Sequence, residues 1–148
     1  MNPLNKPPRA AALLGYAGLL PFVIAALAIH ARWPDAALPV QVFIAYGAAI
    51  LAFLGGIQWG LALGPGRAGA SERMAIGVLP SLLAWLALLL DPAGAIGLLA
   101  AGFAALLAWE RYRCPVIDPA WYLGLRTRLT LAVLLCHGIA LAGLTTTS

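Results

Sequence analysis

Charged residues are scarce in this chain of 148 residues. Asp, Glu, Lys and Arg together make up only 9% of the sequence, whereas soluble domains contain about 25%. Hydrophobic residues make up 63%, and the mean hydropathy is +0.93. Such a chain has too few polar residues to cover a water-exposed surface, which excludes an ordinary soluble domain and indicates a membrane protein.

Cysteine, histidine and acidic residues are also few, and this limits metal, redox and acid–base chemistry. The chain has two cysteines and two histidines. Cys114 lies in a polar stretch while Cys136 lies within an apolar one, so we expect neither a disulfide nor a zinc site. The sequence contains no nucleophile elbow, phosphate-binding loop or paired acidic metal site. We therefore expect a protein that is not an enzyme, with no catalytic residue, no metal site and no cofactor.

Five apolar stretches follow one another along the chain. A transmembrane helix needs about 20 predominantly apolar residues, so segment 74–109 is too long for a single crossing. Asp91-Pro92 divides this segment, because proline lacks the backbone donor and clashes with the preceding turn of a helix. We therefore predict an all-α integral membrane protein with one five-helix transmembrane domain over residues 1–148. The spans are expected at about 10–29, 40–63, 74–90, 93–109 and 123–144.

The basic residues fall almost entirely on one side of these spans. Lysine and arginine accumulate in the cytoplasmic segments of membrane proteins. In the five-span order, all of the nine basic residues except Arg32 fall on the side of the N-terminus. A single crossing by segment 74–109 would erase this bias. The pattern therefore predicts a cytoplasmic N-terminus and a C-terminus on the opposite, periplasmic side.

The net charge of +4 and the isoelectric point near 9.6 could indicate binding to nucleic acid. The basic residues flank apolar spans, however, and do not form one soluble face. We therefore expect no nucleic-acid partner. Contact with anionic membrane lipids, at about 1 kcal/mol per basic residue near the surface, is the expected use of these charges.

Small residues at four-residue spacing in the second span predict close helix packing. Small side chains let two helix backbones approach each other, and packing replaces the hydrophobic drive that is missing between helices in lipid. The simplest interpretation is packing within the chain, and homodimerisation through this span is the alternative. The residues are Ala48, Ala52, Gly56, Gly60 and Gly64.

Gln58 lies on the face of this helix opposite Gly56, at 3.6 residues per turn. A polar amide should not face lipid, where its hydrogen bonds would be unmet. We therefore expect two buried faces on the second span and a position at the bundle centre. Pro80 leaves the carbonyl of Ile76 without a helical donor at a similar depth. The sequence thus predicts a hydrogen bond from Gln58 to that carbonyl.

Two ionisable groups are functional candidates because of their depth. His137 lies well inside the last span, where a neutral imidazole packed against a backbone carbonyl is the plainer interpretation. A proton relay, a quinone contact or a haem ligand is the alternative. Glu110 is expected to form an interfacial ion pair with a nearby arginine, or to border a pocket for an anionic headgroup, which arginine binds well. The nearby arginines are Arg111, Arg113, Arg126 and Arg128.

Two segments of the chain carry a family resemblance. Residues 46–60 contain Phe-Leu-Gly-Gly followed by Trp-Gly, and residues 121–130 read Trp-Tyr-Leu-Gly-Leu-Arg-Thr-Arg-Leu-Thr. Pro80 followed by Trp85 strengthens the match. Together they resemble the small bacterial inner-membrane family catalogued as domain of unknown function thirty-four twenty-nine, which is related to mitochondrial transmembrane protein sixty-nine. The resemblance implies a multi-pass protein of the bacterial inner (cytoplasmic) membrane, and it implies no particular activity.

The sequence leaves three kinds of function open. The first is a non-enzymatic protein that supports the assembly or organisation of membrane complexes or lipids. The others are a small transporter or channel and a module that binds lipid or quinone. The expected partners are membrane lipids, and a membrane protein or a second copy of the chain. The candidate ligand-binding residues are Gln58, Trp59, Glu110, Trp121, Tyr122, Arg126, Arg128 and His137, and the candidate packing residues are Ala52, Gly56, Gly60, Gly64 and Pro80.

Overall fold

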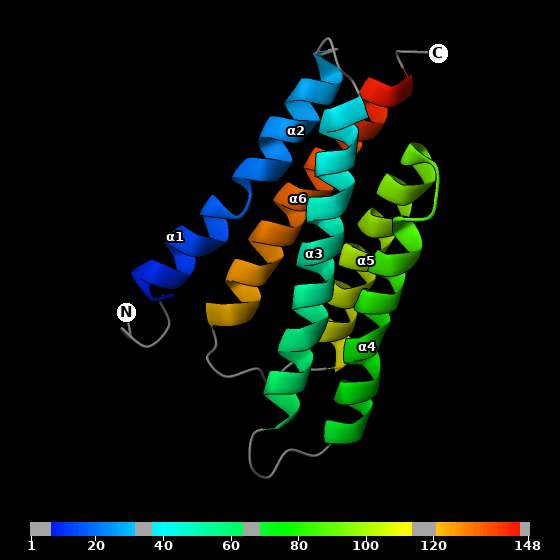
Figure 1. Ribbon diagram of the computed structural model, residues 1–148. Coiled ribbons are helices and arrows are strands. Elements are labelled where there is room, and N and C mark those ends of the chain that lie inside the picture. The colour runs from blue at the N-terminus through cyan, green and yellow to red at the C-terminus, as the bar shows by residue number, and fades with distance from the viewer. Residues whose placement is uncertain (1–6, 32–36, 64–68, 114–120, 146–148) are drawn as a thin grey trace.

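The computed structural model describes residues 7–31, 37–63, 69–113 and 121–145, and these ranges contain helices and no strand. The prediction of an all-α protein is confirmed. The helices form an elongated bundle in which successive long helices run in opposite directions (Figure 1). They are α1 (Arg9–Ala17), α2 (Leu20–His30), α3 (Ala37–Ala62), α4 (Ala70–Ala87), α5 (Pro92–Arg113) and α6 (Trp121–Thr145).

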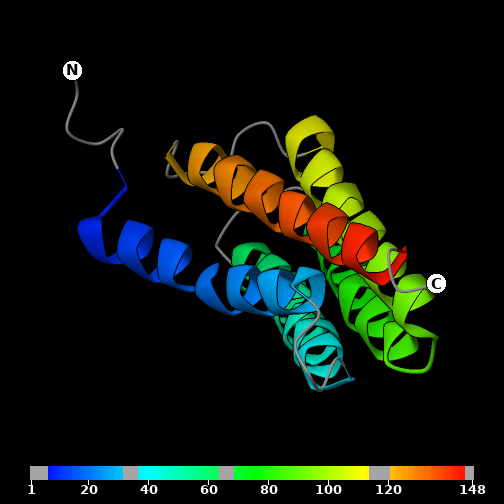
Figure 2. The ribbon, with the colours of Figure 1, turned by 90° about the horizontal axis from the view of Figure 1, so that it is seen from above.

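The first predicted span is a broken helix that consists of α1 and α2. The break lies at Gly18 and Leu19, just before Pro21. Pro21 lies in the first turn of α2, where the N–H that it lacks would have no helical partner. The Tyr46 hydroxyl on α3 donates a hydrogen bond of 2.9 Å to the Gly18 carbonyl. Beyond this anchored break, α1 leans away from the bundle (Figures 1 and 2).

Segment 74–109 is two antiparallel helices, as the sequence predicted. Helix α4 ends at Ala87 and α5 begins at Pro92, with a tight turn between them. The Asp91 carboxylate accepts a hydrogen bond of 3.1 Å from the backbone N–H of Gly94. It thereby satisfies one of the free donors in the first turn of α5.

Within the described residues, four helical segments are long and apolar enough to cross a membrane. They are Arg9–His30, with α1 and α2 taken together, and α3, α5 and α6. Large apolar side chains point away from the bundle, for example Leu14, Phe53 and Leu135, which are each more than 60% exposed. An outward-facing apolar surface of this kind fits lipid and would be unfavourable in water. The chain is therefore a multi-pass membrane protein.

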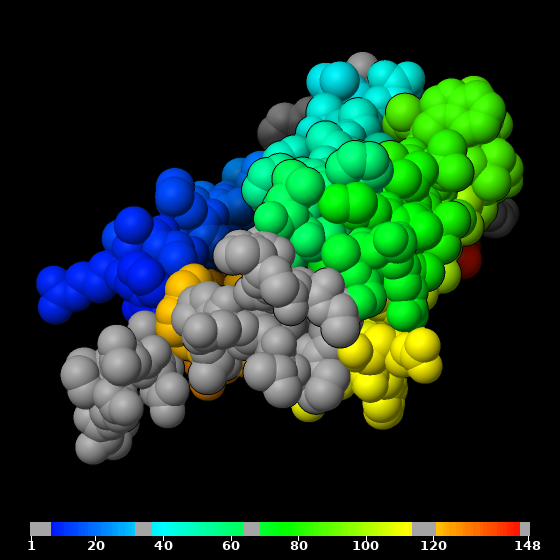
Figure 3. All heavy atoms as spheres, turned by 90° about the horizontal axis from the view of Figure 1, so that it is seen from below, coloured from blue at the N-terminus to red at the C-terminus, as the bar shows by residue number. Residues whose placement is uncertain are grey.

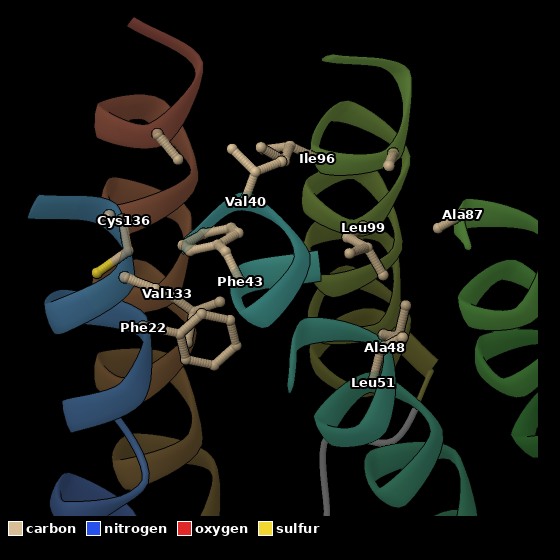
Figure 4. Close-up of a cluster of buried hydrophobic side chains, with 14 of the residues drawn as sticks. Phe22, Val40, Phe43, Ala48, Leu51, Ala87, Ile96, Leu99, Val133 and Cys136 are labelled. Carbon is tan, nitrogen blue, oxygen red and sulfur yellow. The ribbon is translucent and has the colours of Figure 1, made fainter. Parts of the chain in front are cut away.

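Aromatic rings fill the centre of the bundle. Phe22 from α2 packs edge-to-face against Phe43 from α3 and Phe103 from α5, with ring centroids 5.5 and 6.1 Å apart. Figure 4 shows Phe22, Phe43 and Val133 converging from α2, α3 and α6. These side chains are buried together with Leu51 and other apolar residues. We call Phe22, Phe43 and Phe103 the aromatic layer.

Helices α3 and α4 approach each other through their backbones. A side chain on Gly55 would collide with the Gly77 carbonyl, and a Cβ on Gly77 would lie 2.9 Å from the Gly55 carbonyl oxygen. Pro80 is buried beside Gly55. This glycine pair was not singled out from the sequence, although Gly55 lies one residue from the predicted stripe.

The predicted packing role of Gly56 and Gly60 within the chain is wrong. No atom of the described residues lies within 4 Å of a Cβ placed on either glycine. Each four-residue step turns about 40° around the helix, so a stripe of four-residue steps leaves the buried face. Ala48 is buried, Ala52 is half-buried and Gly56 is exposed. Gly64 lies outside the described residues.

The buried face of α3 is instead the one that carries Gln58. Its residues are spaced by a mixture of four-residue and three-residue steps, so they stay on one side of the helix. Helix α3 contacts α2, α4 and α5, but the expectation of two buried faces is wrong. The buried residues on this side include Gly47, Leu51, Gly55, Gln58 and Ala62.

Candidate functional site

Antiparallel packing gathers the arginines of the described residues at one end of the bundle, which we call the basic end. The C-terminal ends of α3 and α5 and the N-terminal ends of α4 and α6 lie there, and the N-terminal end of α1 points to the same side (Figure 1). Figure 3 views this end from below, with the end of α5 in yellow and the start of α6 in orange. The arginines are Arg9, Arg73, Arg111, Arg113, Arg126 and Arg128.

Five polar side chains form a connected chain inside the basic end, and we call them the ionic cluster. Arg73 Nη1 donates to Gln58 Oε1 at 3.0 Å, and Gln58 Nε2 donates to Glu110 Oε1 at 2.5 Å. Arg126 Nε lies 3.2 Å from Glu110 Oε2, and Arg126 Nη1 donates to Thr130 Oγ1 at 2.6 Å. The cluster therefore joins α3, α4, α5 and α6.

Burial makes these contacts strong determinants of the fold. Gln58 and Glu110 are completely buried, and Arg126 is 6% exposed. A buried ion pair tolerates loss of one partner poorly, because the remaining charge has neither water nor a counter-ion. The Arg73 guanidinium also lies 5.5 Å from the centre of the Trp109 ring, which fits a cation–π contact.

Two buried donors, one in the ionic cluster and one beside it, lack a well-formed hydrogen bond. They are Arg126 Nη2 and the hydroxyl of Tyr122, a residue that interacts with Arg126, and neither donor has a partner at hydrogen-bonding geometry among the described residues. Arg73 and Arg126 are cationic and Glu110 is anionic, so the three groups carry a formal charge of +1 when all are ionised. Free donors and excess positive charge suit an acceptor oxygen that bears negative charge.

The predicted pair between Glu110 and an arginine is confirmed, and its partner is Arg126. The pair is buried between the helices. Other arginines at this end make exposed contacts: Arg113 pairs with Glu72 at 3.2 Å, and Arg111 donates to Thr127 at 3.0 Å. Arg126 differs because it faces the other helices, whereas Arg128, two residues later, points outward.

The predicted hydrogen bond from Gln58 to the Ile76 carbonyl is wrong. Gln58 does lie beside this part of α4, because a Cβ on Gly77, next to Ile76, would lie only 3.1 Å from Gln58 Cβ. The amide nevertheless bonds to Arg73 and Glu110. Hydrogen bonds to charged groups are about twice as strong as those between neutral groups, which favours these partners over a peptide carbonyl.

His137 is the packed histidine that the plainer interpretation predicted. It is 1% exposed, and its Nδ1 lies 2.8 Å from the Val133 carbonyl. Because a carbonyl can only accept, Nδ1 carries the proton in this contact. Its ring packs against those of Phe22, Phe43 and Phe103. The structure therefore does not bring His137 into the ionic cluster.

The remaining candidates surround the basic end without joining the cluster's hydrogen bonds. Trp59 is 46% exposed and lies against Gly77. Trp121 and Arg128 line a shallow hollow of about 490 Å³ between α1 and α6. Tyr122 lies nearer to the cluster than the other candidates, because its buried hydroxyl interacts electrostatically with Arg126 and Glu110.

Sequence reasoning missed two members of the cluster, Arg73 and Thr130. Thr130 lies four residues after Arg126, a spacing that places both on one helix face. The sequence gave little reason to expect Arg73 in a site. It follows Glu72 at the start of α4, and charged residues at a helix end usually face water. Among the described residues, no group of three His, Cys, Asp or Glu could hold a metal, and Cys136 is a free thiol. Cys114 lies outside the described residues.

Two apolar cavities lie deeper in the bundle. One, of about 180 Å³, lies where the break between α1 and α2 faces α3, α5 and α6, and Arg126 and Thr130 are among its lining residues. The other, of about 190 Å³, lies between α4 and α5 beside Pro80, Leu83 and Trp109. We call them the break cavity and the hairpin cavity.

Comparison with known proteins agrees with a membrane protein. The family described as "Protein of unknown function (DUF3429)" matches residues 7–142. Transmembrane protein 69 of Xenopus tropicalis is 37% identical over 134 residues, which cover 86% of this chain and 51% of that protein. Transmembrane protein 69 of Mus musculus is 32% identical over 140 residues, covering 90% and 56%. The chain thus spans about half the length of these relatives. No solved structure matches the chain significantly.

Proposed function

We propose that this chain, which belongs to the DUF3429 family of proteins of unknown function, is a non-enzymatic, five-span protein of the bacterial inner membrane that organises anionic lipid. The observation that carries the proposal is the gathering of the described arginines at the basic end. Anionic lipids attract basic residues at a membrane surface by about 1 kcal/mol per residue.

The fifth span is α4, which packs along α3 and α5. Its 18 residues rise about 27 Å at 1.5 Å per residue, close to the roughly 30 Å of a hydrocarbon core. The turn that follows it returns the chain directly into α5. Five crossings place the basic end on one side of the membrane, and the positive-inside rule makes that side the cytoplasm.

The pairing of the cluster favours lipid organisation over transport. Its hydrogen bonds are made mainly within the protein, and the aromatic layer lies between it and the opposite end. Transport paths usually contain ionisable groups along their length. Arg111, Arg113 and Arg128, by contrast, are exposed at the basic end and available to headgroups.

Lipid that co-purifies with the protein tests the proposal. The protein is extracted from native membranes with mild detergent, and the bound lipid is quantified by mass spectrometry. We expect enrichment of phosphatidylglycerol and cardiolipin over phosphatidylethanolamine, and loss of that enrichment in the double variant Arg111→Gln/Arg128→Gln. The matched variant Arg111→Lys/Arg128→Lys keeps the charge and should retain it. Identical lipid profiles for all three proteins would refute the proposal.

Cysteine accessibility tests the five-span topology separately. Leu63 at the basic end and Leu90 in the turn between α4 and α5 are both exposed. Each is replaced by cysteine in a background without the native cysteines. In spheroplasts, a membrane-impermeant maleimide should label Leu90→Cys directly and Leu63→Cys only after permeabilisation. Labelling in the opposite order, or of both sites from one side, would overturn the topology.

A further inference from the structure

The break cavity and the hairpin cavity are similar in volume but differ in chemistry. The hairpin cavity is lined by apolar residues and the Trp109 side chain. The break cavity is also mainly apolar, yet Arg126 and Thr130 form part of its wall. Arg126 is only 6% exposed. Burial of a charged side chain beside an apolar space destabilises the fold unless the charge is paired or binds a ligand.

Arg126 has donors left over after its contacts within the protein. Glu110 lies beside its Nε, and Thr130 accepts from its Nη1, but Nη2 has no hydrogen-bond partner among the described residues. The Thr130 hydroxyl accepts the bond from Arg126 and has its own proton left to donate. These two side chains can therefore hold an oxygen-rich, negatively charged head.

The rest of the cavity suits a single hydrocarbon chain. Phe22, Phe103 and Val133 line its deeper part, and Figure 4 shows Phe22 beside Val133. Its volume of about 180 Å³ is below the range of about 300–1,000 Å³ that is usual for drug-sized ligands. Such a space accommodates a segment of one chain and not a lipid with two chains.

The cavity opens towards lipid. Leu14 and Phe53 belong to its lining and are 74% and 64% exposed. Helix α1 leans away from the bundle at this point (Figure 2). Gly15 closes one side, because a Cβ there would lie 2.8 Å from Leu129 Cδ1. A ligand can therefore enter sideways from the bilayer.

We propose that the break cavity binds a long-chain fatty acid, whose carboxylate is held by Arg126 and Thr130 and whose chain runs towards Phe22 and Val133. A monoanion balances the formal charge of +1 on Arg73, Arg126 and Glu110, whereas a quinone or an alcohol does not. The inference rests on the proposed lipid-organising function and names a ligand for one site within it.

A photoreactive fatty acid tests the proposal directly. The full chain, in nanodiscs of phosphatidylethanolamine and phosphatidylglycerol, is irradiated with palmitate that carries a diazirine near its methyl end. Peptide mapping should place the label on α2, α5 or α6 near Phe22, Phe103 and Val133. Unlabelled palmitate should compete, whereas hexadecanol, ubiquinone and added phosphatidylglycerol should not. Equal labelling of the hairpin cavity, or equal competition by hexadecanol, would overturn the proposal.

Matched variants separate binding from folding. Thr130→Val keeps the shape of the side chain and should weaken competition by palmitate about tenfold, the effect of one hydrogen bond to a charged group. Leu54→Trp should fill the break cavity and abolish labelling, while Leu83→Trp in the hairpin cavity should leave it unchanged. Each variant is first shown to be monodisperse and as stable to heat as the parent. Undiminished labelling of a stable Leu54→Trp protein would refute the site.

The two proposals can fail independently. The Arg111→Gln/Arg128→Gln protein should lose its enrichment in anionic lipid and keep palmitate labelling, because neither arginine lines the break cavity. Thr130→Val should keep its enrichment in anionic lipid and bind palmitate more weakly. If the Arg111→Gln/Arg128→Gln protein loses its enrichment but is still labelled, both proposals are supported. If it also loses palmitate labelling, the cavity proposal is contradicted.

Discussion

Near the basic end, α3, α4, α5 and α6 meet through charged and amide side chains, whereas further along the bundle α2, α3, α5 and α6 meet through aromatic rings around His137. In the first region, each polar atom needs a particular partner at a particular distance. In the second, shape and ring geometry suffice, and the one imidazole is bonded within its own helix. The contrast teaches that one bundle uses specific pairing in one half and close packing in the other.

Removal of Glu110 should have the largest effect on this contrast. Glu110→Ala leaves Arg126 and Arg73 without their counter-ion, which should lower the free energy of unfolding by about 3–5 kcal/mol. Unfolding in a titration of sodium dodecyl sulfate, followed by circular dichroism, measures the loss. Glu72→Ala is the control, because the ion pair of Glu72 with Arg113 is exposed and should contribute about 0–1 kcal/mol. Equal losses would remove the distinction between buried and exposed pairs.

Removal of the bridging amide should rank next. Gln58→Leu takes one donor from Glu110 and one acceptor from Arg73, so we expect a loss of about 1.5–3 kcal/mol. Gln41→Leu is the same substitution on an exposed position of the same helix and should be nearly neutral. The same titration measures both variants. A neutral Gln58→Leu would mean that the cluster tolerates a gap, contrary to the specific pairing described above.

The glycine contact between α3 and α4 supplies a test of close packing. Gly55→Val places a side chain against the Gly77 backbone, which cannot rotate away, and should cost about 1–3 kcal/mol. Gly56→Val makes the same change one residue later, where no described atom is near, so its cost should be much smaller. Thermal unfolding in detergent compares the two. A larger loss for Gly56→Val would point to a contact of Gly56 with another molecule.

The smallest effect is expected at His137. Its imidazole is surrounded by phenylalanine rings and makes one hydrogen bond, so His137→Phe should cost only about 1 kcal/mol. Thermal unfolding again measures the change. A loss comparable to that of Glu110→Ala would show that the imidazole does more than pack, and would revive the proton relay as an interpretation.

The fold could largely be predicted from the sequence because its signals are local. Asp91-Pro92 divides a segment that is too long for one helix, and the structure begins α5 at Pro92. The break in the first span lies at Gly18, where Tyr46 from another helix holds it. Contacts of that kind leave no mark in the local sequence.

The site was predicted less completely. The pairing of Glu110 with Arg126, in preference to Arg111, Arg113 or Arg128, depends on which of these side chains turns towards the other helices. Gln58 was expected to be buried, but its partners come from α4 and α5, and only the packing of those helices brings them within reach. The prediction that Gly56 packs within the chain failed because residues spaced by four rotate gradually around the helix. Gly55, one residue earlier, lies on the buried side.

The sequence by itself determined that the protein is helical, apolar and asymmetric in its basic residues, because hydropathy, proline and charge act along a continuous stretch of chain. The tertiary structure decided which arginine is buried, which face of α3 is covered and where the cavities lie. In lipid, apolar side chains face other helices and the membrane almost equally well, so hydrophobicity does not select between these faces. The selection depends on backbone contact at Gly55 and Gly77 and on the pairing of Gln58, Glu110 and Arg126.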